Sequence, residues 1–174
     1  MSLRDSIQIA LLLAIGTILH LIIPGYGSGM KPDLLLSMLF IVLIVEKDVV
    51  PSAILAGILA GLLSALTTTF PGGQIPNIID KMATTMIVFL LVRLFNGKVN
   101  SKIISFLVGV IGTITSGLVF LGSALFIVGL PAPFTVLFVT VVLPATVMNT
   151  IAVLILHPII VFSKNTIEST IQKV

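Results

Sequence analysis

Long apolar runs, separated by short groups of glycine, proline and charged residues, make up most of this chain. Cutting the sequence at these groups gives six apolar stretches, most of them near the ~20 residues that a helix needs to cross a bilayer. The second stretch is short and the last is long, so we expect a tilt, a kink at Pro144 or an interfacial end. The stretches are Ser6–Ile23, Pro32–Val45, Pro51–Phe70, Pro76–Phe95, Ser101–Val128 and Pro133–Phe162.

Composition places the chain in the membrane. Of its 174 residues, 57% are hydrophobic and only 9% are charged, and the mean hydropathy is +1.30. These values predict an all-α integral membrane protein, a bundle of six transmembrane helices that forms one domain over residues 1–174. No internal repeat is evident. The absence of cysteine excludes disulfides and thiolate metal sites.

The basic residues predict the orientation, because Lys and Arg collect in cytoplasmic connections. Lys31 and Lys81 fall on one side of the predicted bundle and all the others on the opposite side. We therefore expect both termini to be cytoplasmic, with the connections Pro24–Pro32, Phe70–Pro76 and Gly129–Pro133 facing outward. This distribution indicates topology and not nucleic-acid binding, since no basic run contains interleaved aromatic residues. The predicted cytoplasmic group is Arg4, Lys47, Arg93, Lys98, Lys102, Lys164 and Lys173.

Two outer turns each carry a lysine and an aspartate: Lys31 with Asp33, and Asp80 with Lys81. A charge near a membrane core calls for a reason. Charges of both signs at the mouth of an apolar bundle suit a small zwitterion with an apolar body, such as an amino acid with a large side chain. Lys81 is expected in the first turn of its helix, where the helix dipole disfavours a cation, so it needs an anionic partner. The alternatives are solvated turns and a Lys81 that pairs only with its own neighbour.

Four uncharged or weakly basic side chains are further candidates. Gln74 and Asn77 flank Pro76 at the outer turn, where an amide can cap the helix or bind a carboxylate; capping is the preferred reading for Asn77. Asn149 lies one turn past Pro144 at membrane depth and must find a partner, either a helix neighbour or a substrate. His20, near the outer end of the first helix, is a minor candidate.

Small residues form ridges on three of the predicted helices. Ala10 and Ala14 lie one turn apart on the first helix, where another helix could approach closely. Such a ridge serves either internal packing or docking onto a larger partner, and periodicity does not distinguish the two. The other ridges are Ala53, Gly57, Gly61 and Ala65, with Ala56, Ala60 and Ser64 beside them, and Gly109, Thr113 and Gly117.

Several classes of chemistry are disfavoured. His20 and His157 fall toward opposite membrane faces and no carboxylate pair shares a helix face, so we expect neither a metal site nor a catalytic centre. There is no phosphate-binding GxxxxGK[ST] motif and no buried acid or base in the inner halves of the spans to relay protons. The sequence predicts a binding protein without its own energy source, without a cofactor and without enzymatic activity.

Four segments carry a resemblance to a known family. Small six-span chains with an Ala-x-x-x-Ala patch in the first helix and an outer pocket resemble the substrate-binding S components of energy-coupling-factor (ECF) transporters. The segments are similar to those of the tryptophan-specific S component of Firmicutes, over nearly the whole chain. They are Gly-Met30-Lys31-Pro32-Asp33, Phe70-Pro-Gly-Gly-Gln74-Ile-Pro-Asn77-Ile-Ile-Asp80-Lys81, Ile127-Val-Gly-Leu-Pro131 and Val142-Leu-Pro144-Ala-Thr-Val-Met-Asn149-Thr.

The resemblance implies a function and partners. The chain would bind L-tryptophan from the outer side and deliver it by toppling in the bilayer, docked on a membrane scaffold subunit and two cytoplasmic ATPases. Ala10 and Ala14 would face the scaffold, and the outer connections would cap the pocket. The pocket residues would be Lys31, Asp33, Gln74, Asn77, Asp80, Lys81 and Asn149.

Three other functions compete with this one. An S component for another aromatic compound or a vitamin is the nearest. A self-contained secondary amino-acid carrier is disfavoured by the small size, the lack of inverted repeats and the lack of a buried coupling acid. A membrane enzyme acting on lipid is disfavoured by the scattered histidines and carboxylates.

Overall fold

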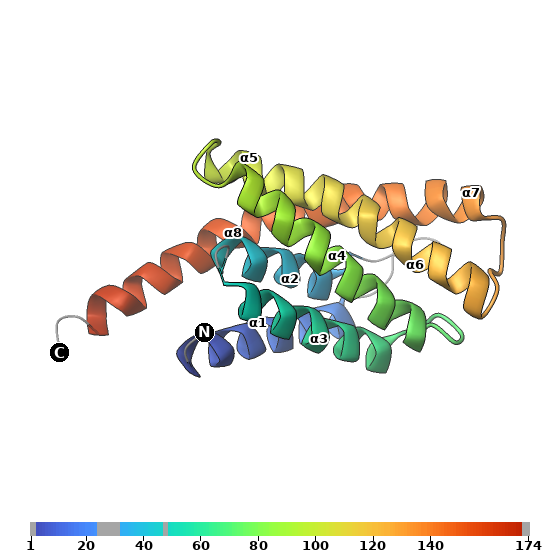
Figure 1. Ribbon diagram of the computed structural model, residues 1–174, viewed down its shortest axis with the longest axis horizontal. Helices are drawn as coiled ribbons and strands as arrows, with labels where there is room; N and C mark the ends of the chain where they lie inside the picture. Colours follow the sequence, from blue (N-terminus) through green and yellow to red (C-terminus); the bar gives the residue numbers. More distant parts are fainter. Residues whose placement is uncertain (1–2, 24–31, 47–48, 172–174) are drawn as a thin grey trace.

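In the computed structural model, residues 3–23, 32–46 and 49–171 are described, and every regular element within them is a helix. Figure 1 shows the helices aligned along one long axis. α5, η1 and α6 follow one another without a break, as do α7, η2 and α8. The elements are α1 (Leu3–Ile22), α2 (Leu34–Val45), α3 (Val50–Thr67), α4 (Gln74–Phe95), α5 (Ser101–Leu107), η1 (Val108–Gly112), α6 (Thr113–Ile127), α7 (Phe134–Leu137), η2 (Phe138–Val142) and α8 (Leu143–Ile171).

The all-helical prediction is confirmed, and each predicted stretch corresponds to helix, although α8 continues to Ile171, past the predicted end at Phe162. Among the described residues, four helices are long and apolar enough to cross a membrane: Leu3–Ile22, Val50–Thr67, Ser101–Ile127 and Phe134–Ile167. α4 has 22 residues, but its apolar character is interrupted by Asp80, Lys81 and Arg93. α4 also begins at Gln74, two residues before the predicted start at Pro76.

α2 differs most from the other helices, because it lies inside the bundle (Figure 1). All its residues from Leu34 to Ile44 are buried. Its 12 residues span only about 18 Å at ~1.5 Å per residue, well short of the ~30 Å hydrocarbon core of a bilayer. α2 is thus the core around which the longer helices pack, and its N-terminal residue Leu34 and the preceding Asp33 lie within the bundle.

Small residues on α3 and α5–η1–α6 bring neighbouring helices close together. A Cβ added to Gly57 of α3 would lie 3.0 Å from Oγ1 of Thr85 on α4, and one added to Gly109 would lie 2.8 Å from Cα of Thr150 on α8. These ridges therefore serve internal packing, where close backbone approach increases dispersion contact. Ala10 and Ala14 of α1 are instead exposed.

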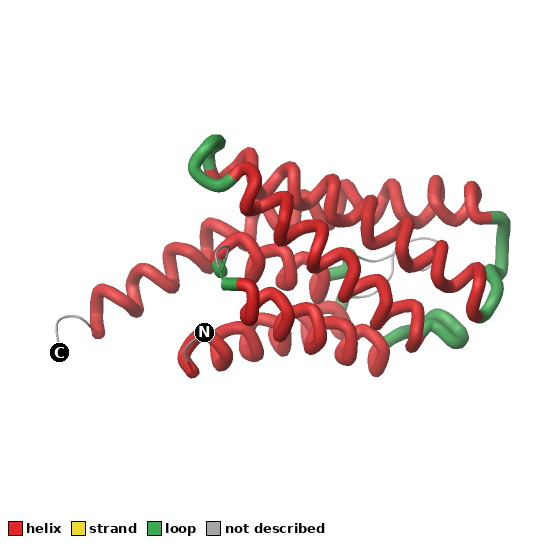
Figure 2. Tube along the Cα trace, in the orientation of Figure 1, coloured by secondary structure: helices red, strands yellow, loops and turns green. Residues whose placement is uncertain are grey.

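The long final helix is irregular around its prolines. The π-helical turn η2 ends two residues before Pro144, and Pro158 lies inside α8. A proline cannot donate to the carbonyl one turn earlier, and local π turns and bends are the usual consequence. Figure 2 shows the C-terminal part of α8 turning away from the bundle.

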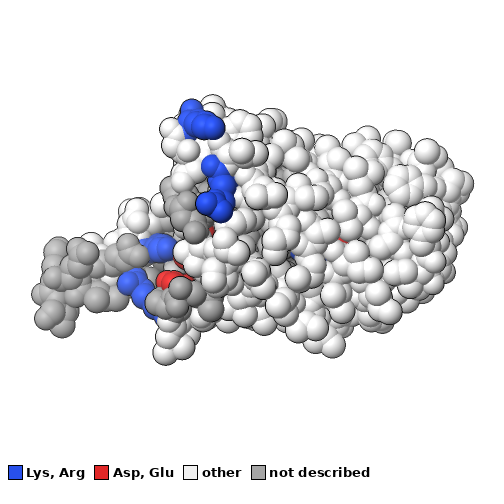
Figure 3. Space-filling model, viewed as in Figure 1, with Lys and Arg blue, Asp and Glu red and all other residues white. Residues whose placement is uncertain are grey.

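Basic side chains gather at one end of the molecule, where the N-terminal end of α1 and the C-terminal part of α8 lie (Figure 3). They come from helix ends that meet there, such as Arg93 in the last turn of α4 and Lys102 in the first turn of α5. The rest of this face is almost free of charged side chains. Of the predicted cytoplasmic group, Lys47 and Lys173 lie outside the described residues.

Candidate functional site

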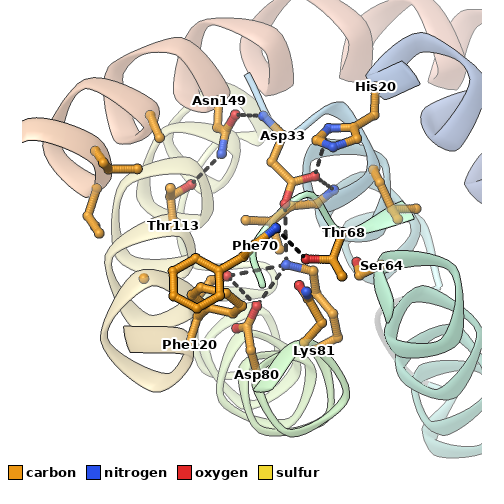
Figure 4. A pocket seen from close by; sticks show the side chains of 18 of the residues that line it. His20, Asp33, Ser64, Thr68, Phe70, Asp80, Lys81, Thr113, Phe120 and Asn149 are labelled. Carbon is orange, nitrogen blue, oxygen red and sulfur yellow. Dashed lines mark hydrogen bonds and ion pairs between the residues drawn. The ribbon is translucent and has the colours of Figure 1, made fainter. Parts of the chain in front are cut away.

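A cavity of about 340 Å³ lies beside the N-terminal end of α2 (Figure 4). Its volume is near the lower end of the ~300–1,000 Å³ typical of small-molecule sites. The cavity exists because the short α2 does not fill the space between its longer neighbours. Its polar lining comprises His20, Asp33, Ser64, Thr67, Thr68, Thr69, Asn77, Asp80, Lys81, Thr113, Ser116 and Asn149. The remaining lining is apolar and includes Phe70, Phe120, Leu121, Leu137, Val141 and Met148.

A buried ion pair forms one wall of the cavity. Lys81 Nζ lies 2.8 Å from Asp80 Oδ2, and the two side chains are only 3% and 1% exposed. Asp80 also accepts hydrogen bonds of 2.9 Å from the Thr84 hydroxyl at Oδ1 and from the Ser116 hydroxyl at Oδ2. A buried pair needs such added hydrogen bonds to offset the cost of desolvating its charges. Asp80 is thus held firmly by α4 and α6.

Lys81 does not lie in the first turn of its helix, so that prediction was wrong. α4 begins at Gln74 with Gly73 as its N-cap residue, and Lys81 therefore lies about two turns in. The helix dipole acts mainly within the first turn, so it does not explain the partners of Lys81. The prediction that Lys81 needs an anionic partner is confirmed, because both Asp80 and Asp33 lie within ion-pair distance.

Asp33 connects α2 to this pair. As the N-cap residue of α2 it accepts a 2.9 Å hydrogen bond at Oδ1 from the Leu36 N–H. Its Oδ2 lies 3.3 Å from Lys81 Nζ, and its Oδ1 lies 3.6 Å from Nδ1 of His20 on α1. The Asp33 side chain is 29% exposed, far more than those of Asp80 and Lys81. Asp33 is therefore the carboxylate that the cavity presents most openly.

Asn149 reaches the same point from α8. Its Oδ1 accepts a 2.8 Å hydrogen bond from the Asp33 backbone N–H, and its Nδ2 lies 3.5 Å from the Thr113 hydroxyl. The residue is completely buried. The amide of Asn149 thus finds its partner at the N-terminal end of α2, and Asn149 also borders the cavity.

Three other predicted residues have different outcomes. Asn77 lines the cavity but is not the helix cap: Gly73 is, and the Asn77 amide donates a 2.8 Å hydrogen bond to the Gly73 carbonyl. Gln74 is exposed and is not among the lining residues. Lys31 lies outside the described residues.

Several lining residues were not predicted from the sequence as site residues. Thr84 could have been found, because it lies four residues after Asp80 and so one turn away on the same helix face. Ser116 and Thr113 gave no such signal, since isolated hydroxyl residues in apolar helices commonly bond to their own backbone. Only the packing of α6 against α4 brings Ser116 to Asp80.

Aromatic side chains form the apolar side of the cavity. Phe70 and Phe120 meet edge to face, with ring centroids 5.3 Å apart and an interplanar angle of 87°. Both rings border the cavity, as Figure 4 shows. Phe126 is 88% exposed and lies apart from it.

The site therefore combines charges of both signs, neutral hydrogen-bonding groups and an aromatic wall in one cavity. Among the described residues, no group of three or more His, Cys, Asp or Glu side chains could hold a metal ion. Fold and site together define a helical membrane protein with a cavity of small-molecule size.

The sequence places this chain in a family. Residues 2–164 match the family described as "Tryptophan transporter TrpP", and the chain belongs to that family. It is 52% identical over 151 residues to a probable tryptophan transport protein of Clostridium acetobutylicum, covering 87% of this chain and 88% of the relative. It is 48% identical over 160 residues to one of Bacillus subtilis, covering 92% of each chain.

A third relative has the same description. The chain is 43% identical over 160 residues to a probable tryptophan transport protein of Clostridium perfringens, covering 87% of each. No solved structure matches the chain. Family membership and several membrane-capable helices make this a multi-pass protein of the bacterial plasma membrane.

Proposed function

We propose that this protein captures L-tryptophan in the cavity beside α2. The observation that carries the proposal is that Asp33, Asp80, Lys81 and Asn149 line the same cavity of about 340 Å³ as the rings of Phe70 and Phe120. A tryptophan zwitterion has matching parts, since its ammonium and carboxylate need polar partners and its indole ring needs apolar surface. The three relatives named as tryptophan transport proteins support the same substrate.

In the proposed complex the indole ring lies against Phe70 and Phe120, and the amino-acid group lies toward Asp33 and Asn149. Edge-to-face and offset-stacked ring pairs are favourable, and an indole between these side chains can form both. Asn77 adds an amide at the margin of the cavity. Lys31 and Gln74 remain candidates from the sequence alone.

We further propose that the chain acts as the S component of an ECF-type importer and is not an enzyme. It would dock on a membrane scaffold subunit with two cytoplasmic ATPases and topple to deliver its substrate. The exposed positions of Ala10 and Ala14 on α1 support a docking role for that face, because the ridges on α3 and η1 are occupied by internal packing. The gathering of basic side chains at one end supports a cytoplasmic location of that end.

The substrate assignment is tested by titrating the purified chain in detergent with L-tryptophan. The protein contains no tryptophan, so all indole fluorescence comes from the ligand. A saturable change is expected with L-tryptophan and not with a vitamin such as riboflavin, which is followed by its own fluorescence. Saturable binding of the vitamin without binding of L-tryptophan would overturn the assignment.

The transport assignment is tested in proteoliposomes. The chain alone should bind tryptophan without accumulating it, and accumulation should require the scaffold, the ATPases and ATP. Accumulation by the chain alone under an ion gradient would instead identify a secondary carrier.

A further inference from the structure

The cavity has an unequal number of positive and negative groups. Among the described residues that line it, the titratable side chains are His20, Asp33, Asp80 and Lys81. One lysine thus faces two aspartates. With His20 neutral, the described lining carries one more negative than positive charge, which a ligand cation can neutralise.

Lys81 is already surrounded by acceptors from the protein. An ammonium group carries three N–H donors, and three acceptors lie around Nζ: Asp80 Oδ2 at 2.8 Å, Asp33 Oδ2 at 3.3 Å and Ser116 Oγ at 3.5 Å. The side chain is 3% exposed. A ligand carboxylate that approached Lys81 would have to displace one of these partners and also face the two aspartates.

Asp33 is arranged in the opposite way. Its carboxylate offers about four lone-pair sites; the Leu36 N–H and Lys81 take one each, and Nδ1 of His20 lies 3.6 Å from Oδ1. Its side chain is 29% exposed at the cavity, whereas that of Asp80 is 1% exposed. The carboxylate is also fixed in position, because Asp33 caps α2 and its backbone N–H is bound to Asn149.

The groups that remain for a ligand carboxylate are uncharged. The described lining offers the hydroxyls of Ser64 and Thr68 and the amide of Asn77. The two ends of a zwitterion therefore meet different partners. The ammonium meets a fixed opposite charge, whereas the carboxylate meets only neutral donors.

We propose that this site, taken as the tryptophan site proposed above, selects its ligand by the ammonium group. Asp33 receives the ammonium, Lys81 is a positioning residue that holds Asp33 and Asp80, and neutral donors receive the carboxylate. The ligand class is therefore aromatic amines, with the α-carboxylate as a secondary contact.

The experiment compares three indoles by calorimetry with the purified chain at pH 8, where histidine side chains are largely neutral. L-Tryptophan has both charged groups, tryptamine only the ammonium and indole-3-propionate only the carboxylate. Tryptamine should bind about ten- to a hundredfold more tightly than indole-3-propionate, as one charge-assisted hydrogen bond allows. Equal binding of the two, or tighter binding of indole-3-propionate, overturns the inference.

The same titrations separate this inference from the proposed function. Binding of tryptamine without binding of L-tryptophan would remove the proposed substrate and keep the selection by the ammonium. Binding of L-tryptophan with a preference for indole-3-propionate would keep the substrate and remove the selection. Binding of none of the three would overturn both.

Variants test the roles of the two residues. Asp33→Asn keeps the shape of the side chain and should weaken the binding of L-tryptophan and tryptamine about ten- to a hundredfold while sparing that of indole-3-propionate. A purely structural role would weaken the binding of all three alike.

Lys81→Met should change the affinities for L-tryptophan and for tryptamine by the same factor. If that variant does not fold, the double variant Asp80→Asn/Lys81→Met, which removes both buried charges, replaces it. A loss for L-tryptophan but not for tryptamine would make Lys81 the carboxylate contact and overturn the positioning role.

Discussion

Asp33 and Asn149, 116 residues apart in the chain, are joined by a 2.8 Å hydrogen bond from the backbone N–H of Asp33 to the side-chain Oδ1 of Asn149. This bond ties the N-terminal end of α2 to α8 at the edge of the cavity. The first N–H groups of a helix and its cap have no partners within the helix, and here an amide from another helix supplies one. The position of the Asp33 carboxylate therefore depends on α8.

Replacing Asn149 by alanine should lower both stability and ligand affinity. The partly buried Asp33 N–H would lose its acceptor, which costs up to about 1–3 kcal/mol, and the carboxylate would lose its fixed position. Thermal unfolding in detergent and L-tryptophan titration measure the two effects. Asn165→Ala, an exposed change on the same helix, is the matched control and should leave both unchanged. Equal behaviour of the two variants would show that the Asp33–Asn149 bond contributes nothing.

A double-mutant cycle on Lys81 and Asp80 should show strong coupling. Lys81→Met leaves Asp80 charged and buried without its ion partner, and such a loss typically costs about 3–5 kcal/mol. Asp80→Asn should be milder, because an asparagine can still bond to Thr84 and Ser116. The double variant should be more stable than Lys81→Met alone in ligand-free thermal unfolding. Additive losses would mean that the two side chains do not interact.

The sequence could predict most of the helices, because their apolar runs are long and their ends carry glycine, proline or charge. The sequence predicts α2 as a short transmembrane helix, yet its 12 residues fall in the ~10–14-residue range that is more typical of buried core helices. An even distribution of apolar residues around a helix fits both a core helix and a span. Length was thus the informative signal, and it also explains the cavity.

The predicted start of α4 at Pro76 is two residues later than the observed start at Gln74. The first turn of a helix tolerates proline at several positions, because its N–H groups lack partners in any case. Taking Asn77 as the helix cap, instead of Gly73, placed Lys81 in the first turn and so gave both residues the wrong roles. The contacts of Lys81 with Asp33 and of Asp80 with Ser116 could not be predicted at all, since they depend on how distant helices pack.

Removing the Phe120 ring should weaken tryptophan binding. Phe120 pairs edge to face with Phe70 at the cavity, and such ring pairs contribute about 0.5–1.5 kcal/mol beyond their buried area. Phe120→Ala should therefore weaken L-tryptophan about three- to tenfold in fluorescence titration. Phe126→Ala, which removes a ring that is 88% exposed on the same helix, should have no effect. A comparable loss in both variants would exclude the aromatic wall as the indole site.

A methyl group at Gly117 should damage the cavity wall. Its Cβ would lie 2.4 Å from Val142 Cγ1, so η2 or the valine would have to shift, and overpacking of this kind costs about 1–3 kcal/mol. Gly117→Ala should reduce thermal stability and tryptophan affinity together. The double variant Gly117→Ala/Val142→Ala removes the two clashing methyl groups and should recover part of the loss. If the second change adds to the damage instead, the clash with Val142 is not its cause.

A bulky residue on the exposed face of α1 should separate transport from binding. Ala10 and Ala14 are exposed one turn apart, so Ala10→Trp or Ala14→Trp should block close approach of a scaffold helix and leave the cavity intact. Gly122→Trp on α6, where an added Cβ meets nothing within 4 Å, controls for the size of the change. Affinity is measured in detergent with radiolabelled L-tryptophan, because the new indole would obscure fluorescence, and uptake is measured in cells with the complete transporter. Uptake should be lost in the two α1 variants and kept in the control, and the affinity should be unchanged in all three variants. If the α1 variants lose binding along with uptake, or retain both, docking through this face is ruled out.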